Sequence, residues 1–310
     1  MDHKTRYELH MVGIDGSNPL AFLAALGAFR VFGAQNNNAT LKWTRSDSWQ
    51  PVITTKTLID ESTFLNQLET NLNCLVGHEA FEIGTDLKVE PSKFRDECKK
   101  ALKSCSKESR ASADFLSSFG SDALTDDKGR IQSTPLCLIS AGQQKFLTII
   151  KAVIDKTESD HLRKTLFENW KYDDPRAGIS LRWDPADDVR HALRWKEPSI
   201  DPDRNNRGSM LGANRLAIEG LPFFTTIPDG KQLQTTGFQL HGEPKTLFWT
   251  WPIWEVPLTV APIRSLLAFK ELQERKPDRK MLRKMGVAEI FRCQRIKNGK
   301  YTNFSPARPV

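Results

Sequence analysis

The stretch Asp15–Phe32, DGSNPLAFLAALGAFRVF, decides the fold of this chain near its N-terminus. Ser17 or Asn18 can cap a helix, and Pro19 suits the first helical turn, where its missing N–H costs nothing. The residues that follow are apolar on nearly every side, which predicts a helix buried in the core. Small residues, which let another backbone come close, recur along it: Ala21, Ala24, Ala25, Gly27 and Ala28. A phosphate-binding loop is not indicated, because neither GxGxxG nor GxxxxGK[ST] occurs.

The segments around this helix predict a mainly helical part that covers residues 1–172. Apolar residues at helical spacing and stretches of mixed charge predict further helices. These helices are expected over residues 58–72, 91–119, 143–154 and 160–170. Short strands are expected over residues 7–14 and, as a pair, within 41–55, and a loop rich in Asp and Gly over 121–130.

The amino-acid composition changes after Trp170, where helical periodicity fades and Trp, Pro, Arg and Gly become frequent. Strands are expected over residues 179–183, 189–195, 221–227, 237–240 and 246–254, with a short helix over 214–220. A helix over 263–274, a very basic helix over 279–285 and a hairpin of 289–296 with 300–304 follow. Asn298-Gly299 is a strong two-residue turn signal. We therefore expect an α+β fold: a helical part to residue 172, then a β-rich, aromatic part over 173–310, as two domains or one.

The composition places the chain among soluble globular proteins and gives no sign of a membrane or metal partner. Of 310 residues, 39% are hydrophobic and 27% charged, too apolar for a disordered chain. The most apolar run, residues 19–34, is too short for a bilayer and contains Arg30. The five cysteines are odd in number and form no CxxC, which favours reduced thiols, a cytoplasmic location and no zinc site. No signal peptide, cofactor or small-molecule substrate is indicated.

The charge of the chain is concentrated at its C-terminal end. Residues 261–310 contain 13 Lys and Arg against 4 Asp and Glu, a net charge of +9, although the whole chain carries only +7. Such a basic end is expected of a protein that binds nucleic acid. The alternative is a basic surface helix that faces solvent and has no partner.

Basic residues in two regions make up the candidate nucleic-acid interface. Arginine and asparagine can donate to phosphates or base edges, and glycine lets the backbone approach a phosphate closely. The first region is a Gly- and Asn-containing stretch with Arg204, Arg207 and Arg215. The second is the C-terminal end with Arg279, Lys280, Arg283, Lys284, Arg292, Arg295, Lys297 and Lys300. Trp249, Trp251 and Trp254 could stack on bases, but their apolar neighbours favour a place in the core.

The sequence signals for a catalytic site are weaker than those for nucleic-acid binding. The aspartates Asp173, Asp174, Asp184, Asp187 and Asp188 could hold a divalent metal for phosphodiester cleavage. Interleaved arginines instead favour salt bridges and turn structure there. The chain contains no GxSxG, no HExxH and no cysteine with an evident histidine partner, so we expect a protein that is not an enzyme.

Four segments together resemble a bacterial CRISPR-associated family, that of type I-G (formerly type I-U) systems. They are Asp15–Gly27, Asp174–Trp195, Gly212–Phe224 and Gly286–Val310, the last reading GVAEIFRCQRIKNGKYTNFSPARPV. The resemblance is to a C-terminal extension of the helicase-nuclease of these systems, and the N-terminal NPLAFLAALGAFRVF is similar in style to the start of their effector large subunit. Helicase motifs and the HD nuclease motif are absent.

The resemblance implies a non-enzymatic subunit or accessory of an RNA-guided, Cascade-like effector in antiviral defence. Its partners would be effector subunits, the helicase-nuclease, and the crRNA–target duplex or double-stranded target DNA, with contacts to the DNA backbone or a flanking motif. One alternative is a protein adaptor that docks the helicase-nuclease onto the effector. A third interpretation, a metal-dependent nuclease, would use the aspartates near Asp184.

Overall fold

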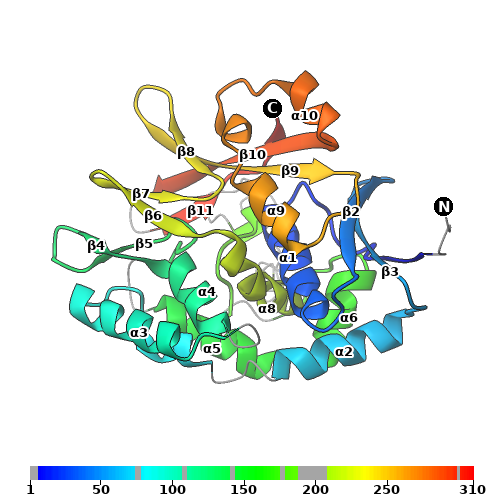
Figure 1. The fold of residues 1–310 in the computed structure, drawn as a ribbon, viewed down its shortest axis with the longest axis horizontal. Helices are drawn as coiled ribbons and strands as arrows, with labels where there is room; N and C mark the ends of the chain where they lie inside the picture. Colours follow the sequence, from blue (N-terminus) through cyan, green and yellow to red (C-terminus); the bar gives the residue numbers. More distant parts are fainter. Residues whose placement is uncertain are drawn as a thin grey trace, which may run out of the picture.

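The computed structural model describes residues 6–73, 78–106, 110–139, 144–174, 179–187, 208–298 and 301–310. It mixes helices and antiparallel sheets, which confirms the α+β class. In Figure 1 the larger sheet lies above a layer of helices, and two central helices run between them. None of the described helices combines the length and the hydropathy that crossing a bilayer requires.

The predicted N-terminal helix is α1 (Pro19–Gly33), and it is buried almost along its whole length. The side chain of Asn18 caps it by accepting hydrogen bonds from the backbone N–H groups of Leu20 and Ala21, at 2.9 and 3.2 Å. Its main neighbour is α8 (Leu211–Gly220). The two backbones approach so closely that a Cβ on Gly27 would lie 1.8 Å from the carbonyl oxygen of Leu216.

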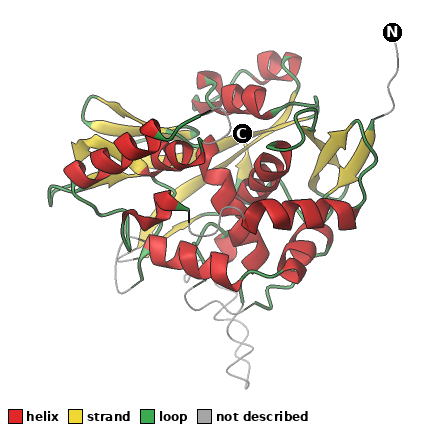
Figure 2. Cartoon of the chain, turned by 60° about the horizontal axis from the view of Figure 1, so that its bottom comes forward, coloured by secondary structure: helices red, strands yellow, loops and turns green. Residues whose placement is uncertain are grey.

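The described residues of the N-terminal part also form a three-stranded antiparallel sheet and five further helices. The sheet has the order β1-β3-β2, formed by β1 (Tyr7–His10), β2 (Thr40–Arg45) and β3 (Trp49–Thr55). The helices are α2 (Glu61–Asn73), α3 (Pro91–Lys103), α4 (Ala111–Phe119), α5 (Phe146–Lys156) and α6 (Ser159–Phe167), with a 3₁₀ turn η1 (Glu79–Ile83). In Figure 2, where the bottom of the molecule comes forward, helices cover much of the side that faces the viewer and most strands lie behind them.

The loop predicted over residues 121–130 is wrong. Strand β4 (Gly120–Thr125) pairs there with β5 (Ile131–Ser133). Only the tip is a turn, in which the carboxylate of Asp126 accepts hydrogen bonds from the backbone N–H groups of Lys128 and Arg130. The sequence did not predict the pairing of β4 with β5, because the residues of β4 and of the turn are mostly polar and resemble those of a loop.

The C-terminal part is built on an antiparallel sheet of order β11-β10-β9-β8, with β12 also paired to β10. Its strands are β8 (Phe238–His241), β9 (Thr246–Trp254), β10 (Val287–Asn298), β11 (Tyr301–Phe304) and β12 (Arg308–Pro309). The hairpin predicted around residues 298–299 is confirmed, because β10 pairs with β11. A second hairpin joins β6 (Thr226–Asp229) to β7 (Gln232–Thr235).

The predicted strand at 179–183 is absent. The backbone N–H of Leu181 donates instead to the side chain of Asn214 at 3.0 Å, and Arg182 has a φ of 64°. The companion segment, residues 189–195, lies outside the described residues. Pro222 lies in a 3₁₀ turn, η3 (Leu221–Phe223), so a strand begins only at Thr226. The predicted helix over 263–274 is divided into α9 (Val260–Leu267) and η4 (Lys270–Gln273), and α10 (Arg279–Lys284) follows.

One continuous cluster of buried side chains runs through both parts, from Leu9 to Phe304. Trp249, Trp251 and Trp254 are fully buried in it, which confirms that these tryptophans belong to the core. Phe22 of α1 packs among them, with its ring centroid 5.6 Å from that of Trp251. The N-terminal helix therefore lies against the C-terminal sheet.

Candidate nucleic-acid interface

Six cations of the C-terminal end lie within residues 275–284, which we call the basic segment, and all of them except Arg279 are exposed. They are Arg275, Lys276, Arg279, Lys280, Arg283 and Lys284. Helix α10 begins after Asp278, whose carboxylate caps it by accepting from the backbone N–H of Met281 at 3.0 Å. This capping role occupies the one acidic side chain of the segment.

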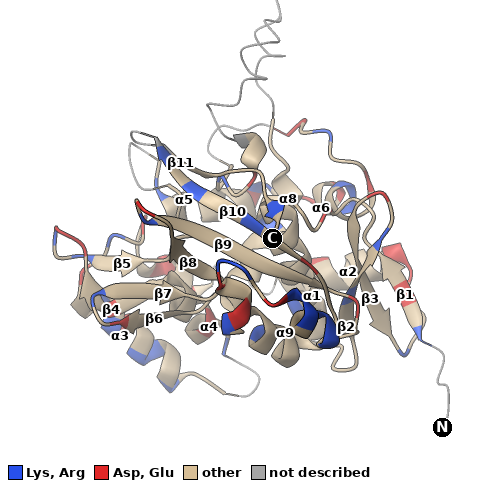
Figure 3. Cartoon of the chain, turned by 90° about the horizontal axis from the view of Figure 1, so that it is seen from above, with Lys and Arg blue, Asp and Glu red and all other residues tan. Residues whose placement is uncertain are grey.

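Helix geometry directs three of these cations to the solvent. Leu282 is 1% exposed and holds α10 against the sheet. At about 100° per residue, Lys280 and Lys284 fall opposite Leu282, and Arg283 lies on the flank of the helix between them and Leu282. All three are exposed. Seen from above, Lys and Arg residues occupy segments drawn close to the C-terminus (Figure 3).

Most of the basic segment lacks a counter-charge. Arg279 forms an ion pair with Glu289 of β10. Within the described part of the chain, no carboxylate pairs with the other five cations. Their charge is therefore available to an anionic partner. Arg275 and Lys276 were missed by the sequence reasoning, although the same charge run contains them.

Arg292 was predicted to contact nucleic acid, and this prediction is wrong. The side chain is 9% exposed and is used inside the fold. Its guanidinium donates to the carbonyl oxygens of Glu274 at 2.6 Å, Arg275 at 3.2 Å and Leu272 at 3.3 Å, and to Thr250 Oγ1 at 2.8 Å. Burial lowers the pKa of Arg292. Arg292 thus ties the backbone that leads into the basic segment to the sheet.

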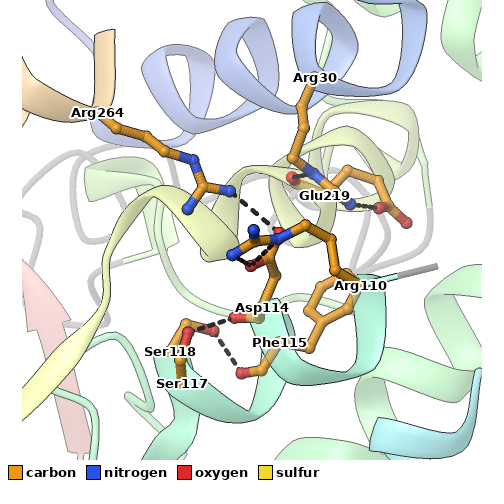
Figure 4. A network of polar contacts seen from close by, with 8 residues as sticks. All are labelled: Arg30, Arg110, Asp114, Phe115, Ser117, Ser118, Glu219 and Arg264. Atoms are coloured by element: carbon orange, nitrogen blue, oxygen red, sulfur yellow. Dashed lines mark hydrogen bonds and ion pairs between the residues drawn. The ribbon is translucent and has the colours of Figure 1, made fainter. Parts of the chain in front are cut away.

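The predicted contact of Arg215 with nucleic acid is also corrected, because the side chain lies in α8 and is only 3% exposed. It donates to Glu219 Oε1 at 2.7 Å and to the carbonyl oxygen of Leu72 at 3.3 Å. Glu219 forms a second ion pair with Arg30 of α1, shown in Figure 4. Burial alone would raise the pKa of Glu219, but the charges of Arg215 and Arg30 outweigh it and lower the pKa.

A neighbouring cluster in Figure 4 joins two further helices. Asp114 of α4 accepts from Arg110 at 3.1 Å and from Arg264 of α9 at 3.2 Å. The guanidinium of Arg30 lies 5.2 Å from the ring centroid of Phe115, which follows Asp114. Arg264 and Arg30 thus connect α9 and α1 to α4, whereas the pair of Arg110 and Asp114 lies within the start of α4.

The remaining predicted residues do not extend the basic segment. Arg295 is half-buried and donates to the carbonyl oxygens of Pro135 and Cys137, at 3.0 and 3.5 Å, so it lies apart from the basic segment. Lys297 is exposed, but it lies about 33 Å along β10 from the end beside α10. Arg204, Arg207 and Lys300 lie outside the described residues.

Two of the aspartates considered for metal binding, Asp174 and Asp184, hold the backbone in place, and Asp188 lies outside the described residues. Asp184, which precedes the 3₁₀ turn η2 (Pro185–Asp187), accepts from Tyr172 Oη at 3.0 Å and from the N–H of Ala186 at 2.8 Å. Asp174 accepts from the N–H of Leu211 at 2.6 Å. Among the residues that the structure describes, no three His, Cys, Asp or Glu side chains are grouped to hold a metal.

Comparison with protein-family models finds no match, and no curated protein matches the chain.

Proposed function

We propose that this chain is a non-enzymatic, nucleic-acid-binding subunit or accessory of an RNA-guided effector complex of the CRISPR type I-G kind. The observation that carries the proposal is the basic segment, where five exposed cations have no described carboxylate partner. The resemblance of four sequence segments to type I-G proteins supports the choice of complex.

The chemistry of the basic segment fits the phosphate backbone. Lys280 and Lys284 are four residues apart and lie on one helix face, with Arg283 beside them. Each phosphate that such a cation neutralises releases counterions, which gives affinity that is independent of sequence and sensitive to salt. In an RNA-guided complex, base pairing selects the target, so contacts of this kind are sufficient for a subunit that holds the duplex.

The test removes three charges and preserves the helix. In the variant Lys280→Gln, Arg283→Gln, Lys284→Gln, glutamine keeps the helix propensity, and the ion pair of Arg279 is left in place. We expect the slope of log affinity against log salt to become shallower by about 2.7 on duplex DNA. Fluorescence anisotropy with a labelled duplex, over a series of salt concentrations, measures it. An RNA–DNA duplex is measured in parallel.

A matched control removes the same charge from another exposed helix. The variant Lys93→Gln, Lys99→Gln, Lys103→Gln on α3 should leave the salt slope unchanged. If the α10 variant also keeps the wild-type affinity and slope, the DNA-binding proposal is rejected. The basic segment would then be tested as a protein-docking surface for the helicase-nuclease, by co-purification of that partner with the wild type and the α10 variant.

A further inference from the structure

A groove of about 400 Å³ lies where β5, β7 and β8 meet, away from α10 in Figure 1. Its walls come from the end of β5, from the β6–β7 hairpin, from the edge strand β8 and from Arg295 of β10. None of its lining residues is acidic, whereas Lys231 and Arg295 are basic. The groove is therefore a positively charged site of the size that small ligands occupy.

Arg295 is the residue in this groove that most needs an anion. Its Nε and Nη2 atoms donate to the carbonyl oxygens of Pro135 and Cys137, which fixes the guanidinium in place. Within the described residues, Nη1 has no acceptor and no carboxylate pairs with the side chain. A cation that is partly removed from water and has no counter-charge gains stability when an anion binds beside it.

Four glutamines line the same groove: Gln132, Gln232, Gln234 and Gln239. The Nε2 atoms of Gln132 and Gln234 donate to the carbonyl oxygens of Thr125 at 3.1 Å and Phe238 at 2.8 Å. These bonds hold both side chains and leave their Oε1 atoms to accept hydrogen bonds. Gln232 and Gln239 are exposed and can both donate and accept.

Apolar side chains complete the groove. Leu240 and Leu247 lie opposite each other on β8 and β9 and are half-buried. They give a flat or cyclic ligand an apolar surface, while the glutamines offer donors and acceptors to its edge. An inorganic anion would use only the Arg295 end and leave the glutamines and leucines unused.

We propose that this groove binds one nucleotide, with its phosphate at Arg295 and Lys231 and its base or sugar along the glutamines. The nucleotide is either free or part of a single strand, since both present the same phosphate and base. The site is separate from the basic segment, and the proposal does not rest on duplex binding by α10.

Adenosine monophosphate and a thymidine pentanucleotide are the probes, and isothermal titration calorimetry measures their Kd. Lys231→Glu and Gln239→Glu each place a carboxylate in the groove at an exposed position whose side chain makes no described hydrogen bond. We expect each to raise the Kd of the bound probe about tenfold, through repulsion of the phosphate. Lys245→Glu, an exposed lysine that does not line the groove, is the matched control and should leave Kd unchanged.

The outcomes separate the ligand sources. Binding of adenosine monophosphate identifies a free nucleotide, whereas binding of the pentanucleotide alone identifies a strand. Inorganic phosphate that binds as tightly as either probe would overturn the assignment of a nucleotide. Absence of binding by both probes, or equal losses in Lys231→Glu and Lys245→Glu, would overturn the site. The α10 variant should bind both probes with the wild-type Kd. The test of the groove is therefore independent of the test of duplex binding by α10.

Discussion

At the scale of single residues, Glu219 links the stability of the fold to pH. Its side chain is fully buried between Arg215 and Arg30, and its pKa lies below the ordinary value of 4.5. A carboxyl whose pKa is lower in the folded state stabilises the fold above its unfolded pKa, and this contribution is lost as the pH falls through the folded pKa. Glu219→Gln should therefore weaken the acid dependence of stability below about pH 4.5.

The same variant should lower the free energy of unfolding at neutral pH by about 3–5 kcal/mol, because the buried guanidinium of Arg215 and the partly buried one of Arg30 lose their shared counter-charge. Urea unfolding over a series of pH values measures both effects. Asp160→Asn provides the control, since Asp160 pairs with Arg163 and Lys164 at the surface and should contribute little. Parallel pH profiles for the wild type and Glu219→Gln would contradict the role of Glu219.

Gly27 makes the close contact between α1 and α8 possible. An alanine there would place its Cβ 1.8 Å from the carbonyl oxygen of Leu216, and backbone cannot move aside as a side chain can. We expect Gly27→Ala to lower the free energy of unfolding by about 3 kcal/mol. Gly33→Ala, on the same helix but with no atom nearer than 3.9 Å, should be neutral or slightly stabilising. Equal urea midpoints for the two variants would refute this account.

At the scale of elements, Arg292 determines how firmly the basic segment is held. It joins β10 to three carbonyl groups between Leu272 and Arg275, just before α10. Arg292→Gln removes most of these bonds, so we expect faster amide hydrogen exchange in residues 270–285 with little change in β1–β3. Lys297→Gln, on the same strand but exposed, should leave exchange in residues 270–285 as it is in the wild type.

Elements with strong local signals were predicted well. The cap at Asn18 with Pro19 specified α1, and alternating aromatic residues specified β9 with the same bounds as in the structure, Thr246–Trp254. Elements that depend on a distant partner were not. The segment 179–183 has strand-like residues, but its backbone bonds to Asn214 of α8, which is distant in the sequence. Local pattern cannot reveal such a partner.

At the scale of the whole molecule, the candidate site was predicted only in part, because charge in a sequence does not reveal burial. The sequence alone does not distinguish the exposed Arg283 from Arg215, Arg292 and Arg295. The guanidiniums of these three arginines bond to Glu219 or to backbone carbonyl groups of the fold. The apolar residues around Arg215 in α8 were a usable sign of burial. The alternation of apolar and polar residues along β10 gave no such sign of burial for Arg292 and Arg295.

The arrangement of the core leads to a prediction about the two parts of the chain. Helix α8, at residues 211–220, is buried on every side, and its main neighbour is α1, at residues 19–33. Fragments 1–172 and 173–310, expressed separately, would each expose one of these apolar helices, so neither should unfold cooperatively in circular dichroism melts. The intact chain should show one transition, with coincident dichroism and tryptophan fluorescence. A fragment 1–172 that melts cooperatively would instead establish two independent domains and limit the α1–α8 contact to an interface between them.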